Sequence, residues 1–154
     1  MRVRAMTADD VERVAALCGQ LGYPSTPAEV AARFEVLRTR TAHAMFVAED
    51  PASVASAPGP VVGFVHVHEA VTLEAGPWAE IGGLVVREGM RSDGIGRLLV
   101  DAAERWAAEH GYAEVHVRSN VVREAAHQFY LHLGYEVVKS QLNFRKPLGA
   151  RGAR

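Results

Sequence analysis

Residues 91–97 combine basic side chains and glycines in a pattern suited to binding an anion. The segment reads Arg-Ser-Asp-Gly-Ile-Gly-Arg and lies between an apolar run at 84–86 and an amphipathic run at 95–106. It therefore predicts a buried strand, a short loop and a helix. The first N–H groups of a helix lack intrahelical partners and carry partial positive charge, and glycines let a bulky anion approach them. With Arg91 and Arg97 adding charge, we expect a site for the diphosphate of a cofactor.

Other phosphate-binding loops fit this segment less well. Gly89 and Gly94 have the spacing of a Walker A loop, but Ile95 and Gly96 stand where that loop needs Lys and Ser or Thr. The dinucleotide-binding pattern needs a third glycine at the position of Leu99. A plainer alternative stays open, in which the glycines serve only a strand–turn–helix connection.

A second group of polar and aromatic residues follows downstream. It contains Ser119-Asn120, Ala125-Ala126 and the run Phe129-Tyr130-Leu131-His132-Leu133-Gly134-Tyr135. The first segment, Arg-x-x-Gly-x-Gly after an apolar strand, resembles the acetyl-CoA signature of the GCN5-related N-acetyltransferase (GNAT) superfamily. The second resembles the later motif of that superfamily, Asn…Ala…(F/L)-Tyr-x-x-x-Gly-(F/Y). The two motifs occur in the expected order, and the resemblance runs from about Glu80 to Pro147.

The resemblance implies acetyl-CoA as co-substrate. Backbone groups of the strand entering the loop would hold the pantetheine arm, and the loop with the start of the helix would hold the diphosphate. Asn120 would also bind the arm, although it equally suits a cap for the helix that follows. The implied cofactor-binding residues are Leu84, Val85, Val86, Arg91, Ser92, Asp93, Gly94, Ile95, Gly96, Arg97, Asn120 and Tyr130.

Two loop residues depart from the superfamily pattern. Asp93 stands where glycine or a basic residue is usual, and its carboxylate should repel phosphate unless it turns outward. This departure bears on affinity for the cofactor more than on the assignment of the loop. Ser92 replaces a common glycine, which predicts a stiffer loop.

Two residues are candidates for proton transfer. Acetyl transfer to an amine needs a base that takes a proton from the amine and an acid that protonates the departing sulfur. By motif position Tyr130 is the candidate acid; the alternative is a core residue on a helix face. Glu80 lies four residues before Leu84, where the superfamily often carries a catalytic carboxylate, and is the candidate base; the alternative is an exposed strand carboxylate. Cys18 lies far from both motifs in the sequence, and no covalent enzyme intermediate is required.

Composition narrows the class of protein. The chain has 154 residues, of which 49% are hydrophobic and 23% charged, as in a soluble globular domain. A formal net charge of −1 gives no electrostatic footprint for nucleic acid, and no apolar stretch reaches the roughly 18 residues of a membrane span. The N-terminus lacks an apolar signal core, and a single cysteine excludes an internal disulfide framework. We therefore expect a cytoplasmic protein.

Two histidines are candidate metal ligands by their spacing. His66 and His68 share one face of a predicted strand, but no acidic or cysteine partner completes a ligand set. No metal is expected. These two histidines either line the acceptor pocket or are satisfied strand residues.

Apolar periodicity places the motifs on an α/β frame with helices and strands mixed. Strands are expected at 2–6, 42–49, 61–69, 78–86, 114–118, 135–138 and 142–146, with turns at 50–60 and 70–77. Helices are expected at about 11–21, 27–37, 95–106 and 122–133. Thr26-Pro27-Ala28-Glu29 predicts a capping box at the start of the second, and Gly134 predicts the stop of the last. We predict one domain over 1–148, a mostly antiparallel mixed sheet of about seven strands with about four helices, and a loose tail over 149–154. The resemblance implies the acyl-CoA N-acyltransferase fold, in which the strands flanking the long helix splay to admit the cofactor arm.

The predicted function is N-acetyl transfer from acetyl-CoA to a primary amine, by direct attack in a ternary complex. The alternative is a non-catalytic acyl-CoA-binding sensor or regulatory module. The acceptor would be a small-molecule amine or a peptide amine, which the near-neutral charge does not distinguish. No nucleic acid or membrane partner is expected, and a homodimer is compatible with the sequence.

Overall fold

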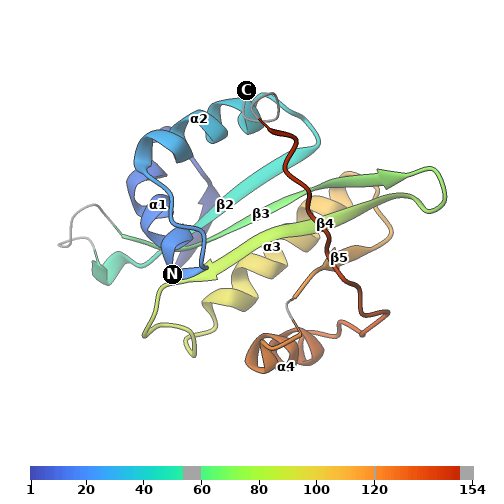
Figure 1. Ribbon diagram of the computed structural model, residues 1–154. Coiled ribbons are helices and arrows are strands. Elements are labelled where there is room, and N and C mark those ends of the chain that lie inside the picture. The colour runs from blue at the N-terminus through green and yellow to red at the C-terminus, as the bar shows by residue number, and fades with distance from the viewer. Residues whose placement is uncertain (54–59, 120, 150–154) are drawn as a thin grey trace. The chain divides into compact units, whose positions relative to one another are not determined.

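Five strands form one open sheet in the N-terminal unit of the protein. The computed structural model describes residues 1–53, 60–119 and 121–149, and the chain divides into two compact units, Met1–Arg118 and Ser119–Arg154. The strands of the first unit lie side by side in chain order (Figure 1). They are β1 (Arg2–Ala5), β2 (His43–Glu49), β3 (Val61–Thr72), β4 (Gly76–Val86) and β5 (Val115–Val117). Neighbours from β1 to β4 are antiparallel and β5 is parallel to β4, which confirms the predicted mixed, mostly antiparallel sheet.

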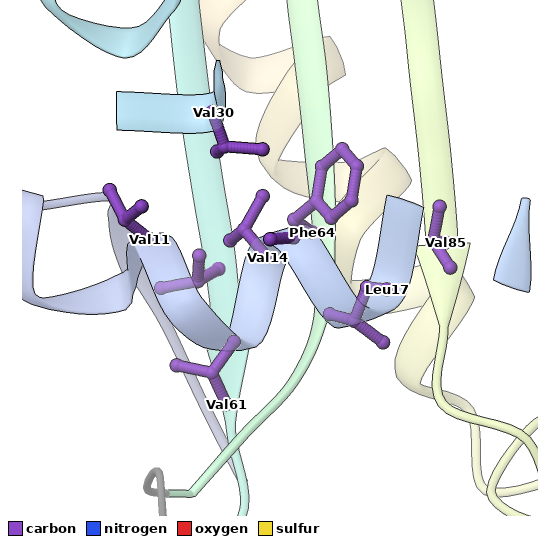
Figure 2. Packing of buried hydrophobic residues seen from close by; sticks show 9 residues of the cluster. Val11, Val14, Leu17, Val30, Val61, Phe64 and Val85 are labelled. Carbon is purple, nitrogen blue, oxygen red and sulfur yellow. The ribbon is translucent and has the colours of Figure 1, made fainter. Parts of the chain in front are cut away.

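Two helices cover one face of this sheet. They are α1 (Val11–Gln20), which follows a short 3-10 helix η1 (Ala8–Asp10), and α2 (Pro27–Arg38). The N-terminus of α2 is the predicted capping box, in which Thr26 accepts a hydrogen bond from the Glu29 N–H. Figure 2 shows apolar side chains of both helices meeting Phe64 of β3 and Val85 of β4. Burial of this apolar stripe anchors the first two helices to the centre of the sheet.

The long helix α3 (Ile95–Glu109) packs on the opposite face. A side-chain carbon at Gly63 of β3 would lie 2.8 Å from the Val85 carbonyl oxygen and 3.0 Å from Leu99 Cδ1 of this helix. Glycine at that position therefore lets α3 approach the sheet closely. None of the described helices has the length and apolar character needed to cross a membrane.

The hairpin of β3 and β4 extends further than predicted. Much of the expected turn at 70–77 continues the strand pairing, with Ala70 opposite Trp78 and Thr72 opposite Gly76. The composition of this segment favours a turn, but cross-strand pairing decides where a strand ends. After β2, a short 3-10 helix η2 (Pro51–Ser53) lies in the other expected turn, of which residues 54–59 fall outside the described part.

Among its described residues, the second unit contains one α-helix, α4 (Glu124–His132). It ends before Gly134, whose φ of +94° is the left-handed conformation predicted for the helix stop. The described residues of this unit contain no strand, so the strands predicted at 135–138 and 142–146 do not form there. Strand pairing needs a partner for each N–H and C=O group, and alternation in a sequence does not supply one. The described sheet accordingly has five strands rather than about seven.

An ion-pair network ties β1 to the start of α1. The Arg4 guanidinium donates to both carboxylate oxygens of Asp10 at 2.8 Å, and the Thr7 N–H donates to the same carboxylate at 2.8 Å. The Asp10 residue is only 5% exposed. Burial alone would raise the pKa of Asp10, but the hydrogen bonds from Arg4 and Thr7 offset burial and hold this pKa below its usual value.

Replacing Asp10 by Asn should lower the free energy of unfolding by about 2 kcal/mol, because the Arg4 charge loses its main partner in a partly buried place. In a chain of this size that corresponds to a melting temperature lower by about 4–8 °C. Because the pKa of Asp10 is depressed on folding, its contribution is present at neutral pH and is lost as pH falls below about 4.

Differential scanning calorimetry at pH 7 and at successively lower pH values checks this prediction. The exposed pair Glu35–Arg38 offers a matched control, and Glu35→Gln should leave the melting temperature essentially unchanged. Equal effects of the two substitutions at pH 7 would contradict the prediction.

Candidate functional site

The loop between β4 and α3 is held at both ends by backbone hydrogen bonds. The Arg87 N–H donates to the Val62 carbonyl at 2.7 Å where β4 ends, and the Asp93 N–H donates to the Met90 carbonyl at 3.3 Å. The Glu88 N–H donates to the Gln20 side-chain carbonyl at 2.9 Å, which fixes the loop to the end of α1. The path of the loop is therefore set by contacts with the sheet and α1.

The N-terminus of α3 presents uncapped donors. Its N-cap residue is Gly94, with φ +76° in the left-handed region, and no side chain caps the first turn. The first helical bond runs from the Leu98 N–H to the Gly94 carbonyl at 3.2 Å. The N–H groups of Ile95, Gly96 and Arg97 precede that bond, so they lie at the positive end of the helix dipole. The geometry is suited to binding an anion.

The loop side chains lie where the sequence predicted a diphosphate site. Arg91 and Arg97 are exposed beside the helix start, as are Ser92 and Asp93. No acidic residue lies within the first turn of α3, and Asp93 comes before its N-cap. Asp93 is exposed to water, which weakens the repulsion between its carboxylate and an anion at the helix start.

Strands β4 and β5 separate close to this loop. They pair only from Ala79 to Ile81 on β4, with Val115 to Val117 opposite. Beyond this point Leu84, Val85 and Val86 have β3 on one side and no described strand on the other. Gly82 is an extra residue in the pairing with β3, a bulge that bends the strand where the pairing with β5 ends. The predicted separation of the strands is confirmed, and it leaves backbone groups of β4 available to a ligand.

Glu80 lies at the point where β4 and β5 part. It pairs with His68 on β3 and with His116 on β5. The carboxylate is 14% exposed, and its oxygens lie 3.8 Å from His68 Nε2 and 3.5 Å from Arg118 Nε. The alternative of a freely exposed strand carboxylate does not describe this side chain, which has basic groups on two sides.

Three histidines form a stacked cluster beside Glu80. Their ring centroids are 5.1–5.3 Å apart in every pair, and His43 Nδ1 lies 2.9 Å from His66 Nε2. Burial, together with the charges of His68 and His43, lowers the pKa of His66 to about 4. Burial and the charges of His68 and Arg40 also lower the pKa of His43. Both rings are therefore neutral at physiological pH.

The sequence indicated only part of this cluster. The spacing of His66 and His68 places them on one face of β3, but His43 comes from β2 and joins them through the antiparallel pairing that sets it opposite His68. No local signal at His43 points to this contact. Within the described residues, no group of three or more His, Cys, Asp or Glu side chains is arranged to hold a metal ion.

Tyr130 belongs to the second unit, on α4. Its ring packs edge-on against Phe129 and Tyr135, with centroid distances of 5.2 and 5.8 Å. Burial raises the pKa of the Tyr130 hydroxyl, and the charge of Arg123 works against this rise. The phenol is therefore protonated at neutral pH, as a proton donor must be. Asn120, the other candidate in this motif, lies outside the described residues.

Cys18, the single cysteine of the chain, is not part of the candidate site. Cys18 lies on α1, half-buried, and burial raises the pKa of its thiol while Arg33 lowers it. A thiol held protonated is a poor nucleophile.

A surface hollow of about 340 Å³ runs along η1, α1 and α2, where Val11 and Phe34 line it, and none of the predicted site residues borders it.

Comparison with known proteins places the chain in a family. The sequence model described as Acetyltransferase (GNAT) family matches residues 10–135. The chain is 37% identical over 91 residues to aminoalkylphosphonate N-acetyltransferase of Salmonella typhimurium (strain LT2), a match that covers 58% of this chain and 58% of that relative's length.

Solved structures share the fold over nearly the whole chain. A putative acetyltransferase from Agrobacterium tumefaciens str. C58 is 25% identical, with a TM-score of 0.76 over 95% of this chain and 100% of that one. The aminoglycoside acetyltransferase AAC(6')-Iy, in complex with the bisubstrate analogue CoA-S-monomethyl-acetylneamine, is 21% identical, with a TM-score of 0.77 over 94% and 97%. With the family match spanning most of its length, the chain belongs to the GNAT family of acetyltransferases.

Proposed function

We propose that this protein transfers the acetyl group of acetyl-CoA to a primary amine. The main support is the arrangement of one strand and one helix: uncapped N–H groups at the start of α3, an unpaired edge of β4, and Glu80 where that edge begins. A diphosphate at the helix start and a pantetheine arm along β4 would direct the thioester toward Glu80. The residues proposed for this binding are Leu84, Val85 and Val86 of β4, residues 91–97 of the loop and helix start, and Asn120 and Tyr130.

In the proposed mechanism the amine attacks the thioester carbonyl directly in a ternary complex. An amine is mostly protonated at neutral pH, so it must first lose a proton, and Glu80 accepts it. The helix start and the strand edge hold the co-substrate, which converts an encounter of two molecules into a reaction between neighbours. Attack leaves a second proton on the nitrogen, which is now positively charged. As the C–S bond breaks, the Tyr130 hydroxyl donates a proton to the sulfur, and its phenolate regains one from the nitrogen, so that the products are the neutral amide, the CoA thiol and the one proton taken by Glu80.

Replacing Tyr130 by Phe should lower kcat by about tenfold, with little change in the KM for acetyl-CoA. The loss is modest because a thiolate with a pKa near that of cysteine is already a fair leaving group near neutral pH. Steady-state kinetics with a good acceptor measure the effect. Tyr135→Phe is the matched control, since its ring packs against Tyr130, and it should retain nearly full activity. An unchanged kcat in Tyr130→Phe would remove the acid from the mechanism.

We further propose that the acceptor is a small-molecule amine. The relatives support this class, since one is named for an aminoalkylphosphonate and another is bound to an acetylneamine analogue. Candidate acceptors therefore include aminoalkylphosphonates and aminoglycosides, with amino acids, polyamines and peptide amines as comparison substrates.

A CoA-release assay over such an amine library tests the proposal, together with calorimetric titration of acetyl-CoA. Binding together with amine-dependent release of CoA supports the enzyme. Binding without release for any amine would favour a non-catalytic acyl-CoA-binding module instead. Absence of binding would overturn the cofactor site itself.

A further inference from the structure

The hydrogen bonds of His68 fix which of its ring nitrogens carries the proton. Its Nδ1 lies 2.9 Å from the Glu69 carbonyl oxygen, which accepts hydrogen bonds and cannot donate one. The Nδ1 atom must therefore bear the hydrogen. In the neutral ring Nε2 is then the unprotonated atom, with a free lone pair.

That lone pair faces the Glu80 carboxylate. The separation of 3.8 Å between His68 Nε2 and Glu80 Oε2 is longer than a hydrogen bond, as expected for two acceptors without a proton between them. The close approach of the ring to β4 depends on glycine at position 82, since a side-chain carbon there would lie 3.2 Å from His68 Nε2. A small movement of either side chain would therefore bring His68 Nε2 within hydrogen-bond distance of a proton on Glu80 Oε2.

The surroundings direct a proton to His68 rather than to its neighbours. The rings of His43 and His66 are hydrogen-bonded to each other, and burial lowers the pKa of both, so both rings disfavour protonation. His116 faces Glu80 from β5 but its Nε2 binds Glu114 at 2.8 Å. Arg118 approaches the other Glu80 oxygen at 3.5 Å and has no proton to accept.

We propose that His68 takes the amine proton from Glu80 and passes it to solvent, so that Glu80 acts as a base through His68. The proposal rests on the proposed function and deepens it. The proton leaves the ammonium nitrogen for Glu80 Oε2 and moves to His68 Nε2, and Nε2 then gives it to water, which restores the Nδ1–H tautomer; the His68 side chain is 22% exposed. The intermediate imidazolium donates to Glu69 through Nδ1 and to Glu80 through Nε2, so both of its N–H groups are satisfied.

A spectroscopic test needs no acceptor. Long-range ¹H–¹⁵N NMR at pH 8.5 on the whole protein reports the tautomer of each neutral imidazole, and His68→Gln identifies the His68 signals by their loss. The expected result is the Nδ1–H tautomer for His68. The Nε2–H tautomer would overturn the proposal, because Nε2 would then already donate and accept nothing from Glu80.

A kinetic test distinguishes a proton path from a structural role. His68→Gln should lower kcat by about tenfold, leave the KM for acetyl-CoA unchanged, and make kcat rise with the concentration of imidazole buffer, which replaces the missing acceptor. The wild type should show no such dependence. His116→Gln, which removes a histidine from the other side of Glu80, should stay within about twofold of wild type without buffer dependence.

Failure of the relay and failure of the proposed function are distinguishable. If acetylation occurs but His68→Gln keeps full kcat, or loses kcat without any response to buffer, the relay is overturned and the enzyme stands. Substitution of His68 in a Glu80→Gln background should cost nothing further, because the relay acts only through Glu80. If no amine is acetylated, the proposed function fails and the relay fails with it, whatever the tautomer of His68.

Discussion

Replacing Glu80 by Gln is expected to lower kcat/KM for an amine acceptor by about 10²–10⁴-fold, the range that a positioned general base contributes. Gln keeps the size and planarity of the side chain at the point where β4 and β5 part, so the strand pairing should be retained. What it removes is the capacity to accept a proton from the amine. The affinity for acetyl-CoA, measured by calorimetry, should be unchanged, because that binding is assigned to the helix start and the strand edge.

The loss of kcat/KM in Glu80→Gln should depend on pH in a defined direction. The variant can use only amine that is already neutral in solution, and that fraction rises about tenfold per pH unit below the pKa of the amine. The deficit relative to wild type should therefore shrink as pH rises toward that value. Glu114→Gln is the control, since this carboxylate lies near β5 but is 71% exposed and binds His116. A deficit of less than about threefold at every pH would remove Glu80 from its role as base.

The helix start was predictable because its signals are local. The glycines, the apolar run before them and the period of 3.6 after them are read within about twenty residues, and α3 begins at Ile95 where this pattern places it. The same holds for the capping box at Thr26 and for the helix stop at Gly134. In each case the backbone conformation depends on residues that are neighbours in the chain.

The histidine cluster could not be predicted for the opposite reason. It depends on the register between β2 and β3, which sets His43 opposite His68. Register is fixed by which faces are buried across the whole sheet, and a shift of one residue would turn His43 to the other face. The bulge at Gly82, beside the His68 ring, is likewise a property of two strands together.

The strand ends were mispredicted for a related reason. Gly and Pro between 70 and 77 favour a turn, yet Val71 pairs with Pro77 and the hairpin continues past both. Conversely, the alternation in 135–138 and 142–146 favours strands, and the described part of the second unit contains none. Local composition describes what a segment tolerates, whereas pairing with another segment decides whether it becomes a strand.

Replacing Gly94 by Ala is expected to weaken acetyl-CoA binding by about tenfold to hundredfold. Gly94 is the N-cap of α3 with φ +76°, a conformation that costs an alanine about 1 kcal/mol. Apart from Gly94 itself and the residues next to it in the chain, no described atom lies within 4 Å of the position that a side-chain carbon would take there. The added methyl group would thus lie in open space beside the uncapped N–H groups, where it meets the diphosphate or tilts the donors away from it. Calorimetric titration of acetyl-CoA measures the change.

Gly89→Ala is a control for backbone strain in the same loop. Gly89 has φ +85° and, apart from its neighbours in the chain, likewise no described atom within 4 Å of an added side-chain carbon, but it stands five residues before Gly94 in the sequence. Gly89→Ala should therefore lower the melting temperature of the free protein as much as Gly94→Ala does, while leaving the affinity for acetyl-CoA within about twofold of wild type. If both variants lost affinity equally, general loop strain would explain the effect. The donors at the start of α3 would then no longer be supported as the place where the diphosphate binds.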